Sequence, residues 1–442
     1  MSGEQFLKIL LLAFLSCALG WVVFSRQDND LSNDDPNKQR YLPIINNLLL
    51  PIYLICVTLL QIPTYGLRQT LELTVPMSFT IFLHISVYYL ILWLFSPLLR
   101  KRLSARACAA LWIIPNYLYL LFNNSLAIES PKFILHISER LFWILTAVWF
   151  LGFLLFMLLA YIQHFRFRKQ ILSAAKQVTE DTVLHIWNEE LASARIKKPR
   201  MKLVVSNAVT APLSIGFFRK TTCVVLPENV YTEEELALIF RHELIHISRE
   251  DAANKFFMVF SKAICWFNPL MWIAMKKSAD DLELSCDETV LLSADDATRK
   301  TYADLILNSV QDASGFTTCL SSTTESLRYR LKSIVKKRTL SSGAVTIALI
   351  SFVLFMTCGT VALAYGGFPA RQDIFPMAGV EAASDLEIYG LNLTAGVKKG
   401  SNYCVDENAL NAYIANLEVA HLNGNYSFNE YDNSILIFYE GT

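Results

Sequence analysis

The chain has 442 residues, of which 53% are hydrophobic, and its mean hydropathy is positive at +0.36. This composition argues against a single soluble domain and indicates a membrane protein. Its formal net charge is zero, so no overall positive field attracts nucleic acid, and we expect no direct nucleic-acid partner.

Six apolar windows are long enough, or nearly so, to span a lipid bilayer. They lie near residues 6–24, 42–62, 77–98, 107–123, 139–162 and 343–364. The fourth window is the weakest, because it is short and contains Pro115. The first resembles a signal peptide, but its long apolar core lacks a clear small-residue cleavage site, which favours a retained helix. The pattern predicts a multi-pass α-helical membrane protein, with about five transmembrane helices in residues 1–163 and the last one in 342–364.

Basic residues cluster beside three of these windows. They are Arg100, Lys101, Arg102 and Arg106 after the third, Arg166, Arg168 and Lys169 after the fifth, and Lys336, Lys337 and Arg338 before the sixth. The positive-inside rule places such loops in the cytoplasm. We therefore expect residues 164–341 to form a cytoplasmic domain and residues 365–442 to form a short extracellular tail or small sensor domain.

The expected cytoplasmic domain begins with an amphipathic helix, 167–195, that continues from the fifth window. Short β-branched runs in 201–228 predict two or three strands. Thr232 and Glu235 have the spacing of a capping box and start a helix that runs to about 248. Further helices are expected near 251–266, 269–292, 297–312 and 323–337. A small sheet followed by helices is an α+β arrangement.

The stretch RHELIHISRED, residues 241–251, carries the chemistry of this domain. His242 and His246 are four residues apart on the expected helix, so both imidazoles project from one face and can bind one metal ion. Glu243 can reach the open position of that metal, where a water would sit. Zinc acidifies such a water and polarises a substrate carbonyl, and the glutamate takes the proton. The alternative is a histidine pair with a chance glutamate, which the small number of histidines, seven, disfavours.

A two-histidine site needs a third protein ligand, and the segment ADDLELSCDETVLL offers Glu283. Asp287 lies one turn later on the same helical face. This pair is similar to that of thermolysin-like zinc peptidases, the gluzincins, in which the aspartate holds a ligand histidine by its free N–H. Rival carboxylates in the segment are interpreted as a solvated acidic face. They are Asp280, Asp281 and Glu288.

The cysteines offer no separate site. Nine cysteines are scattered through the chain without a CxxC pair, so a cysteine zinc site has no support. Only Cys404 lies beyond the last window, which excludes a disulfide within the tail. Cys286, beside the candidate ligand Glu283, is interpreted as a small buried hydrophobe.

Several neighbouring features have two interpretations. Trp266 and Phe267 either dock the domain on the membrane or pack in a core, which is favoured. Arg249 and Asp251 either orient the end of the histidine helix or form a surface ion pair. TTCVVLP, 221–227, is either an edge strand that pairs with an extended substrate or an ordinary buried strand. In the tail, DENALNAYIANLE has a helical pattern and SILIFYE the pattern of a strand.

The chain resembles the membrane-embedded zinc peptidases of the BlaR/MecR antirepressor family. The stretches that carry this resemblance are HELIH, followed by SREDAANK, CWFNPLMW and DLELSCDETVL. APLSIGFFRKTTCVVLPE is similar to the strand region of that family, and the resemblance covers about residues 77–364. It implies a cytoplasmic gluzincin-type domain between membrane helices, in the plasma membrane of a bacterial cell. It also implies a sensor whose signal activates the peptidase, which cuts itself and inactivates a DNA-bound repressor. His242, His246 and Glu283 would then be zinc ligands, and Glu243 the general base.

The chain departs from the β-lactam sensors of that family. Two extra apolar windows precede the matching region, and the tail of about 78 residues is short for a penicillin-binding domain. No serine-x-x-lysine follows residue 365; Ser173–Lys176 and Ser333–Lys336 fit that spacing but lie in the expected cytoplasmic domain. Acylation by a β-lactam is therefore not expected.

Together these patterns predict an integral-membrane zinc endopeptidase in transmembrane signalling, which cleaves itself, a cytoplasmic repressor-like protein, or both. Its expected partners are Zn²⁺, a protein or peptide substrate and the lipid bilayer, and the sequence leaves homodimer formation open. Two alternatives stay open: a housekeeping membrane protease, and a non-enzymatic sensor with a structural zinc site. Glu243 argues against the second alternative, because a structural site does not need it.

Overall fold

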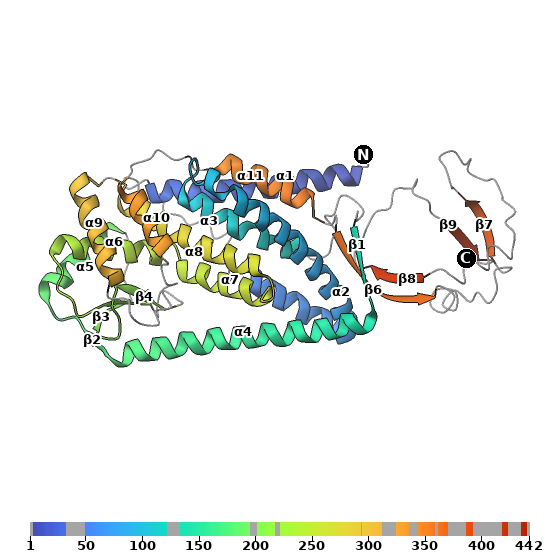
Figure 1. Ribbon diagram of the computed structural model, residues 1–442, viewed down its shortest axis with the longest axis horizontal. Coiled ribbons are helices and arrows are strands. Elements are labelled where there is room, and N and C mark those ends of the chain that lie inside the picture. The colour runs from blue at the N-terminus through green and yellow to red at the C-terminus, as the bar shows by residue number, and fades with distance from the viewer. Residues whose placement is uncertain are drawn as a thin grey trace.

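The computed structural model of the chain is mostly helical (Figure 1). It describes residues 3–31, 49–121, 133–194, 201–216, 222–292, 294–311, 324–335, 341, 343–358, 361–369, 386–391, 418–422 and 435–439. The helical pattern predicted at 406–418 lies outside these residues except for Glu418, which begins the strand β8 (Glu418–Leu422). The strand predicted from SILIFYE is confirmed as β9 (Ile435–Tyr439), which pairs antiparallel with β7 (Leu386–Leu391).

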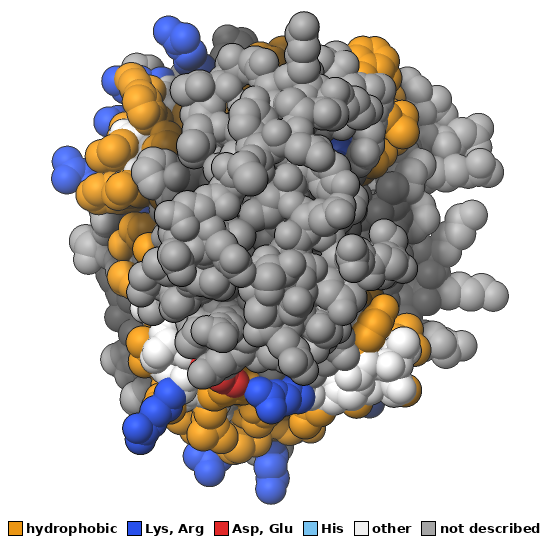
Figure 2. All heavy atoms as spheres, turned by 90° about the vertical axis from the view of Figure 1, so that its right-hand side faces the viewer, with side chains coloured by type: hydrophobic (Ala, Val, Ile, Leu, Met, Phe, Trp, Pro, Cys, Tyr) orange, Lys and Arg blue, Asp and Glu red, His pale blue; other side chains and the backbone are white. Residues whose placement is uncertain are grey.

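Among the described residues, four helical segments are long and apolar enough to cross a membrane. They are Gln5–Ser25 in α1 (Gly3–Leu31), Leu50–Arg68 and Thr74–Leu99 in α2 (Leu49–Leu99), and Glu139–Ser173, which is α4. Large apolar side chains point outward from these helical segments. Phe14 is 68% exposed, Leu60 73% and Leu151 65%. Figure 2, a view along the long axis, shows hydrophobic side chains around the rim of the molecule. Such an apolar exterior fits a lipid environment.

The fourth and sixth predicted windows form shorter elements. Residues of the fourth window lie in α3 (Ala105–Ile113) and in the 3₁₀ helix η2 (Ile114–Leu121). Pro115 lacks an amide hydrogen, and the α-helix ends two residues before it. Because Ala107, Leu111 and Trp112 are at most 2% exposed, the first part of this window packs inside the protein. The sixth window contains α11 (Ala344–Met356), a short apolar helix that lies beside α1 (Figure 1).

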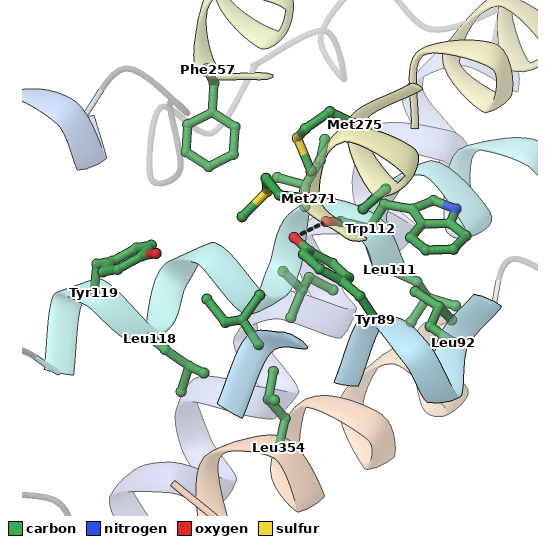
Figure 3. Close-up of a cluster of buried hydrophobic side chains, with 14 of the residues drawn as sticks. Tyr89, Leu92, Leu111, Trp112, Leu118, Tyr119, Phe257, Met271, Met275 and Leu354 are labelled. Atoms are coloured by element: carbon green, nitrogen blue, oxygen red, sulfur yellow. Dashed lines mark hydrogen bonds between the residues drawn. The ribbon is translucent and has the colours of Figure 1, made fainter. Parts of the chain in front are cut away.

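A large core joins the membrane-type helices to two helices of the predicted peptidase region. Those two are α7 (Asp251–Ile264) and α8 (Pro269–Val290). Phe257, Met271 and Met275 are among the residues that α7 and α8 contribute to this core, in which Leu111 and Leu354 also lie (Figure 3). The Tyr89 hydroxyl of α2 donates a 2.9 Å hydrogen bond to the Trp112 carbonyl of α3 within the same core (Figure 3). The position of α8 is therefore fixed by the membrane-type helices.

The predicted strands of 201–228 are confirmed as β3 (Lys202–Ser206), β4 (Leu213–Ile215) and β5 (Cys223–Leu226). With β2 (Ala175–Gln177) they form a sheet of order β2-β3-β5-β4, in which only β3 and β5 are parallel. β5 lies between two strands and its residues are buried, so the edge-strand interpretation of TTCVVLP is wrong. Among the described strands, β2 and β4 form the edges of this sheet.

The prediction of a single helix over residues 167–195 is also wrong. α4 ends at Ser173, β2 follows, and a separate helix α5 covers Asp181–Ser193. Residues 175–177 pair with 204–206 of β3, and this pairing with a segment distant in sequence overrides the local helical pattern.

The helices predicted after the sheet are confirmed within two or three residues. They are α6 (Glu233–Ser248), α7, α8, α9 (Asp296–Gln311) and α10 (Thr324–Val335). The capping box of α6 is present, because the Thr232 hydroxyl accepts from the Glu235 amide while the Glu235 carboxylate accepts from the Thr232 amide. A separate sheet joins β1 (Phe133–Ile137), β6 (Val361–Pro369) and β8 (Glu418–Leu422).

Two tryptophans join α4 to the end of α7. The Trp149 indole donates to the Ile264 carbonyl at 2.8 Å, and the Trp266 indole donates to the Trp149 carbonyl at 3.2 Å. A Cβ at Gly152 would come within 2.3 Å of the Trp266 ring, so only glycine permits this approach. Trp266 therefore packs against α4, as the core interpretation expected.

Candidate metal centre

The two histidines of α6 bring one nitrogen each to a common point. His242 Nε2 and His246 Nε2 are 3.1 Å apart, and the side chains are 14% and 7% exposed. Two nitrogens bound to one tetrahedral zinc at ~2.0–2.1 Å would be about 3.3 Å apart. The histidine pair therefore has the spacing of a shared metal ion.

Glu283 of α8 supplies a third donor atom, an oxygen, at this point. Its Oε2 lies 3.7 Å from His242 Nε2 and 3.5 Å from His246 Nε2. The other oxygen, Oε1, lies 3.6 Å from the Lys255 ammonium. Burial by itself would raise the pKa of Glu283, but the His246 and Lys255 charges and the hydrogen bonds of both imidazoles hold it well below its usual value. Two imidazoles and one carboxylate are a donor set that fits zinc.

Glu243 follows His242 on α6, and its side chain is 6% exposed. Successive helical residues differ in direction by about 100°, so Glu243 starts from the flank of the helix face that carries the histidines.

His246 is held by a residue of the next helix. Its Nδ1 lies 2.7 Å from Asp251 Oδ2, and Asp251 is the first residue of α7. The turn between the helices places Glu250 at φ 57°, in the left-handed region. Arg249 donates to Ser285 and Thr289 of α8. Because Asp251 is 2% and Arg249 7% exposed, the surface ion-pair interpretation is wrong.

His242 is held through a chain of three further residues. Tyr302 Oη of α9 lies 2.8 Å from His242 Nδ1, and its hydroxyl donates to Asp287 Oδ1, also at 2.8 Å. Arg330 of α10 donates two 2.7 Å hydrogen bonds to the same carboxylate. Asp287 Oδ1 is 3.7 Å from His242 Nδ1, so the aspartate reaches the histidine through the tyrosine.

Cys286 is a fourth potential donor that the sequence interpretation did not include. Its thiol is fully buried, and its sulfur and one nitrogen of each histidine all lie within 4.8 Å of one another. The sulfur also donates to the His242 carbonyl at 3.4 Å. Burial by itself would raise the pKa of this thiol, but the charges of His242 and His246 and hydrogen bonds to them lower it to about 7. Its position beside Glu283 in ELSCD was the available signal.

The rival carboxylates of α8 face away from this point. Asp280 accepts from the Ser326 hydroxyl at 3.0 Å, and the Glu288 carboxylate accepts from the Ala105 amide at 3.3 Å. Asp281 is fully buried; Arg100 lies 2.8 Å from it and the Trp112 indole donates to it at 3.3 Å. They are not a solvated acidic face, but contacts that join α8 to α3, α10 and the end of α2.

Comparison with known proteins gives the family. Residues 123–334 match the family described as BlaR1 peptidase M56, and this range includes every site residue named above. The Regulatory protein BlaR1 of Bacillus licheniformis is 26% identical over 170 residues, which is 36% of this chain and 26% of that protein. The Methicillin resistance mecR1 protein of Staphylococcus aureus is 31% identical over 112 residues, 24% of this chain and 19% of that protein.

The Regulatory protein BlaR1 of Staphylococcus aureus is 24% identical over 171 residues, which is 38% of this chain. The chain thus matches between 19% and 27% of the length of these three relatives. An M56 metallopeptidase requires a metal ion, and the donors around His242 and His246 are suitable for one. Residues 123–334, just under half of the chain, thus match the BlaR/MecR-type family of membrane metallopeptidases.

Proposed function

We propose that the protein is a membrane-embedded zinc endopeptidase in transmembrane signalling. The observation that carries this proposal is the convergence of three donor atoms. His242 Nε2, His246 Nε2 and Glu283 Oε2 lie within 3.7 Å of one another, and the buried Glu243 follows His242 on α6. His242, His246 and Glu283 would hold the zinc. A site with three protein ligands leaves a position for water or substrate, as catalytic zinc sites do.

The residues around the site have separable roles. Bound zinc supplies Lewis acidity for the substrate carbonyl and for the attacking water. Glu243 takes a proton from that water and gives it to the leaving amine. Asp251 accepts the Nδ1 proton of His246, and Tyr302 accepts that of His242 while donating its own proton to Asp287. Both imidazoles thereby keep the proton on Nδ1 and a lone pair on Nε2, toward the metal.

The sheet edge supports a peptide substrate. β4 pairs with β5 on one side, and no other described strand pairs with its second side. β4 also contacts α6, which carries the histidines. An extended peptide paired with β4 would lie along the site, held by its main chain. The substrates we propose are the chain itself, a cytoplasmic repressor-like protein, or both, in line with the relatives named regulatory and resistance proteins.

The domain boundaries belong to the same proposal. Residues 164–341 would form the cytoplasmic peptidase, 342–364 the last membrane helix, and 365–442 the external segment. The basic clusters beside the apolar windows support this arrangement. Labelling of single cysteines introduced near residues 195 and 430 tests it, and labelling of both from the same side would contradict it.

One observation favours a second candidate, a non-enzymatic sensor with a structural zinc. Cys286 gives the site a fourth potential donor, and structural zinc sites have four protein ligands. In that case Glu243 would have no role in any cleavage.

The test compares Glu243→Gln with Glu283→Gln in the full chain. Glu243→Gln removes only the proton acceptor, so we expect zinc content to stay near that of wild type and self-cleavage or cleavage of a co-expressed substrate to fall ~10²- to 10⁴-fold. Glu283→Gln removes a charged ligand, so zinc content should fall. Metal analysis and cleavage are measured on the same samples. Unchanged cleavage in Glu243→Gln would refute the peptidase proposal.

A further inference from the structure

The thiol of Cys286 occupies an unusual place for a small buried side chain. Cys286 follows Glu283 by three residues on α8, so both point toward the same side of the helix. Its sulfur and one nitrogen of each histidine lie within 4.8 Å of one another. The sulfur therefore lies near the same two imidazoles that approach Glu283.

The donors around the histidine pair differ in depth. Cys286 is fully buried, while the side chain of Glu283 is 31% exposed. Glu283 thus lies at the open side of the site and the sulfur at its floor. An ion held by both histidines would have the carboxylate on one side and the thiol below, with four protein donors in all. Thiolate is a soft ligand that zinc binds well, and four protein donors close a tetrahedral site.

We propose that the Cys286 thiolate is a fourth metal ligand, which closes the resting centre against water. This inference rests on the proposed zinc site of His242, His246 and Glu283. As the sulfur–metal bond forms, the thiol proton leaves to solvent. Activation breaks that bond, the sulfur takes up a proton again, and water takes its position on the metal.

The structure supplies a second partner for the released thiol. Cys286 Sγ lies 3.4 Å from the His242 carbonyl of α6, to which the protonated thiol donates. The two states of the residue, ligand and hydrogen-bond donor, therefore require only a small displacement of the sulfur. Because Cys286 belongs to α8, a shift of α8 relative to α6 would change its distance from the histidines.

The test replaces the sulfur in the full chain and measures the metal itself. Wild type, Cys286→Ser and Cys286→Ala are purified, stripped of metal and loaded with one equivalent of Co²⁺. Wild type should show the intense thiolate-to-cobalt charge-transfer absorption, and both variants should lose it while still binding the ion. X-ray absorption of the zinc-loaded wild type should give a sulfur shell at ~2.3 Å, absent from the variants. Cys223→Ser, at a buried cysteine of β5, is the matched control and should keep the absorption.

Cleavage provides a second readout. If the thiolate competes with water, basal cleavage by Cys286→Ser should rise severalfold, and that of Cys223→Ser should not change. A wild-type protein that binds cobalt without the charge-transfer band overturns ligation by Cys286 and leaves the three-ligand site intact. Unchanged or lower cleavage in both Cys286 variants overturns the closed resting state. Wild type that binds neither ion would instead remove the proposed zinc site itself.

Discussion

The two halves of α8 lie in different environments. In the first half, Met271, Ala274 and Met275 are at most 2% exposed and belong to the core formed with α2 and α3 (Figure 3). In the second half, Glu283 lies beside the histidines, and Asp287 is bound by three directed hydrogen bonds. The first half positions the helix by filling volume, and the second positions individual atoms.

This difference has a consequence for how each half tolerates change. Apolar packing is non-directional, so a lost side chain lowers stability without changing which atoms face the metal. A directed hydrogen bond, in contrast, fixes the orientation of a ligand, and its loss changes metal affinity. Substitutions in the two halves should therefore separate stability from metal binding.

The largest effect is expected for Asp287→Ala. The carboxylate is 1% exposed and the Arg330 side chain 15%, so the substitution leaves a nearly buried charge without its partner. We expect a loss of about 3–5 kcal/mol in unfolding free energy. Tyr302 would also lose its acceptor, and zinc affinity should fall about 10- to 100-fold. Denaturation in detergent and competitive zinc titration measure the two quantities.

Asp280→Ala is the matched control for this substitution. Asp280 also lies on α8 and contacts α10, through Ser326, but not the histidines. Its loss should leave zinc affinity unchanged. Equal zinc affinities in wild type and Asp287→Ala would contradict the role of the Tyr302 bridge.

Met271→Ala should lower stability almost as much without affecting the metal. Met271 is fully buried in the shared core, and removal of such a side chain costs about 2–5 kcal/mol through lost contacts and the cavity left behind. Zinc content of the folded protein should not change. Ile273, 38% exposed on the same helix, gives the control Ile273→Ala, which should have a small effect on both. A loss of zinc in folded Met271→Ala would show that the halves are not separable.

The smallest effect is expected for Glu288→Gln, whose Tm relative to wild type should change with pH. Burial, with the Asp287 and Asp281 charges, raises the pKa of Glu288 to about 7 despite the hydrogen bond from the Ala105 amide. A raised pKa contributes stability that is complete below the unfolded value of 4.5 and is lost as pH rises through 7. Glutamine keeps an oxygen for the Ala105 amide but does not titrate. The Tm of Glu288→Gln relative to wild type should therefore increase between pH 5 and pH 8.

Glu180→Gln, at an exposed side chain that makes no cap hydrogen bond to α5, controls for the loss of one carboxylate. Its Tm difference from wild type should stay nearly constant over the same range. A Glu288→Gln difference that shrinks toward pH 8 would show that ionised Glu288 stabilises the fold.

Local sequence patterns predicted much of the fold and the three candidate metal ligands His242, His246 and Glu283. The capping box at Thr232 fixed the start of α6, and the spacing of His242 and His246 placed both rings on one face. Glu283 was predicted from its spacing to Asp287, and the structure brings it to the histidines. The roles of these residues in metal binding and catalysis remain predictions.

The rest depends on contacts between distant segments. Tyr302 and Arg330 come from helices 15 and 43 residues beyond Asp287, where a single tyrosine or arginine has no local pattern. β2 was missed because its partner β3 is distant in sequence. The fourth apolar window was taken as a membrane helix because composition alone does not distinguish a lipid-facing helix from one buried among others.

The pair of indole hydrogen bonds between α4 and α7 has a mechanical consequence. Sliding or rotating α4 against α7 would separate both partly buried N–H groups from their carbonyls, which costs free energy. At Gly152 the α4 backbone lies so close to the Trp266 ring that a Cβ there would come within 2.3 Å of it. We therefore expect α4 and α7 to move together as one rigid body. Since Asp251 begins α7, a displacement of α4 along its axis would be transmitted directly to the ring of His246.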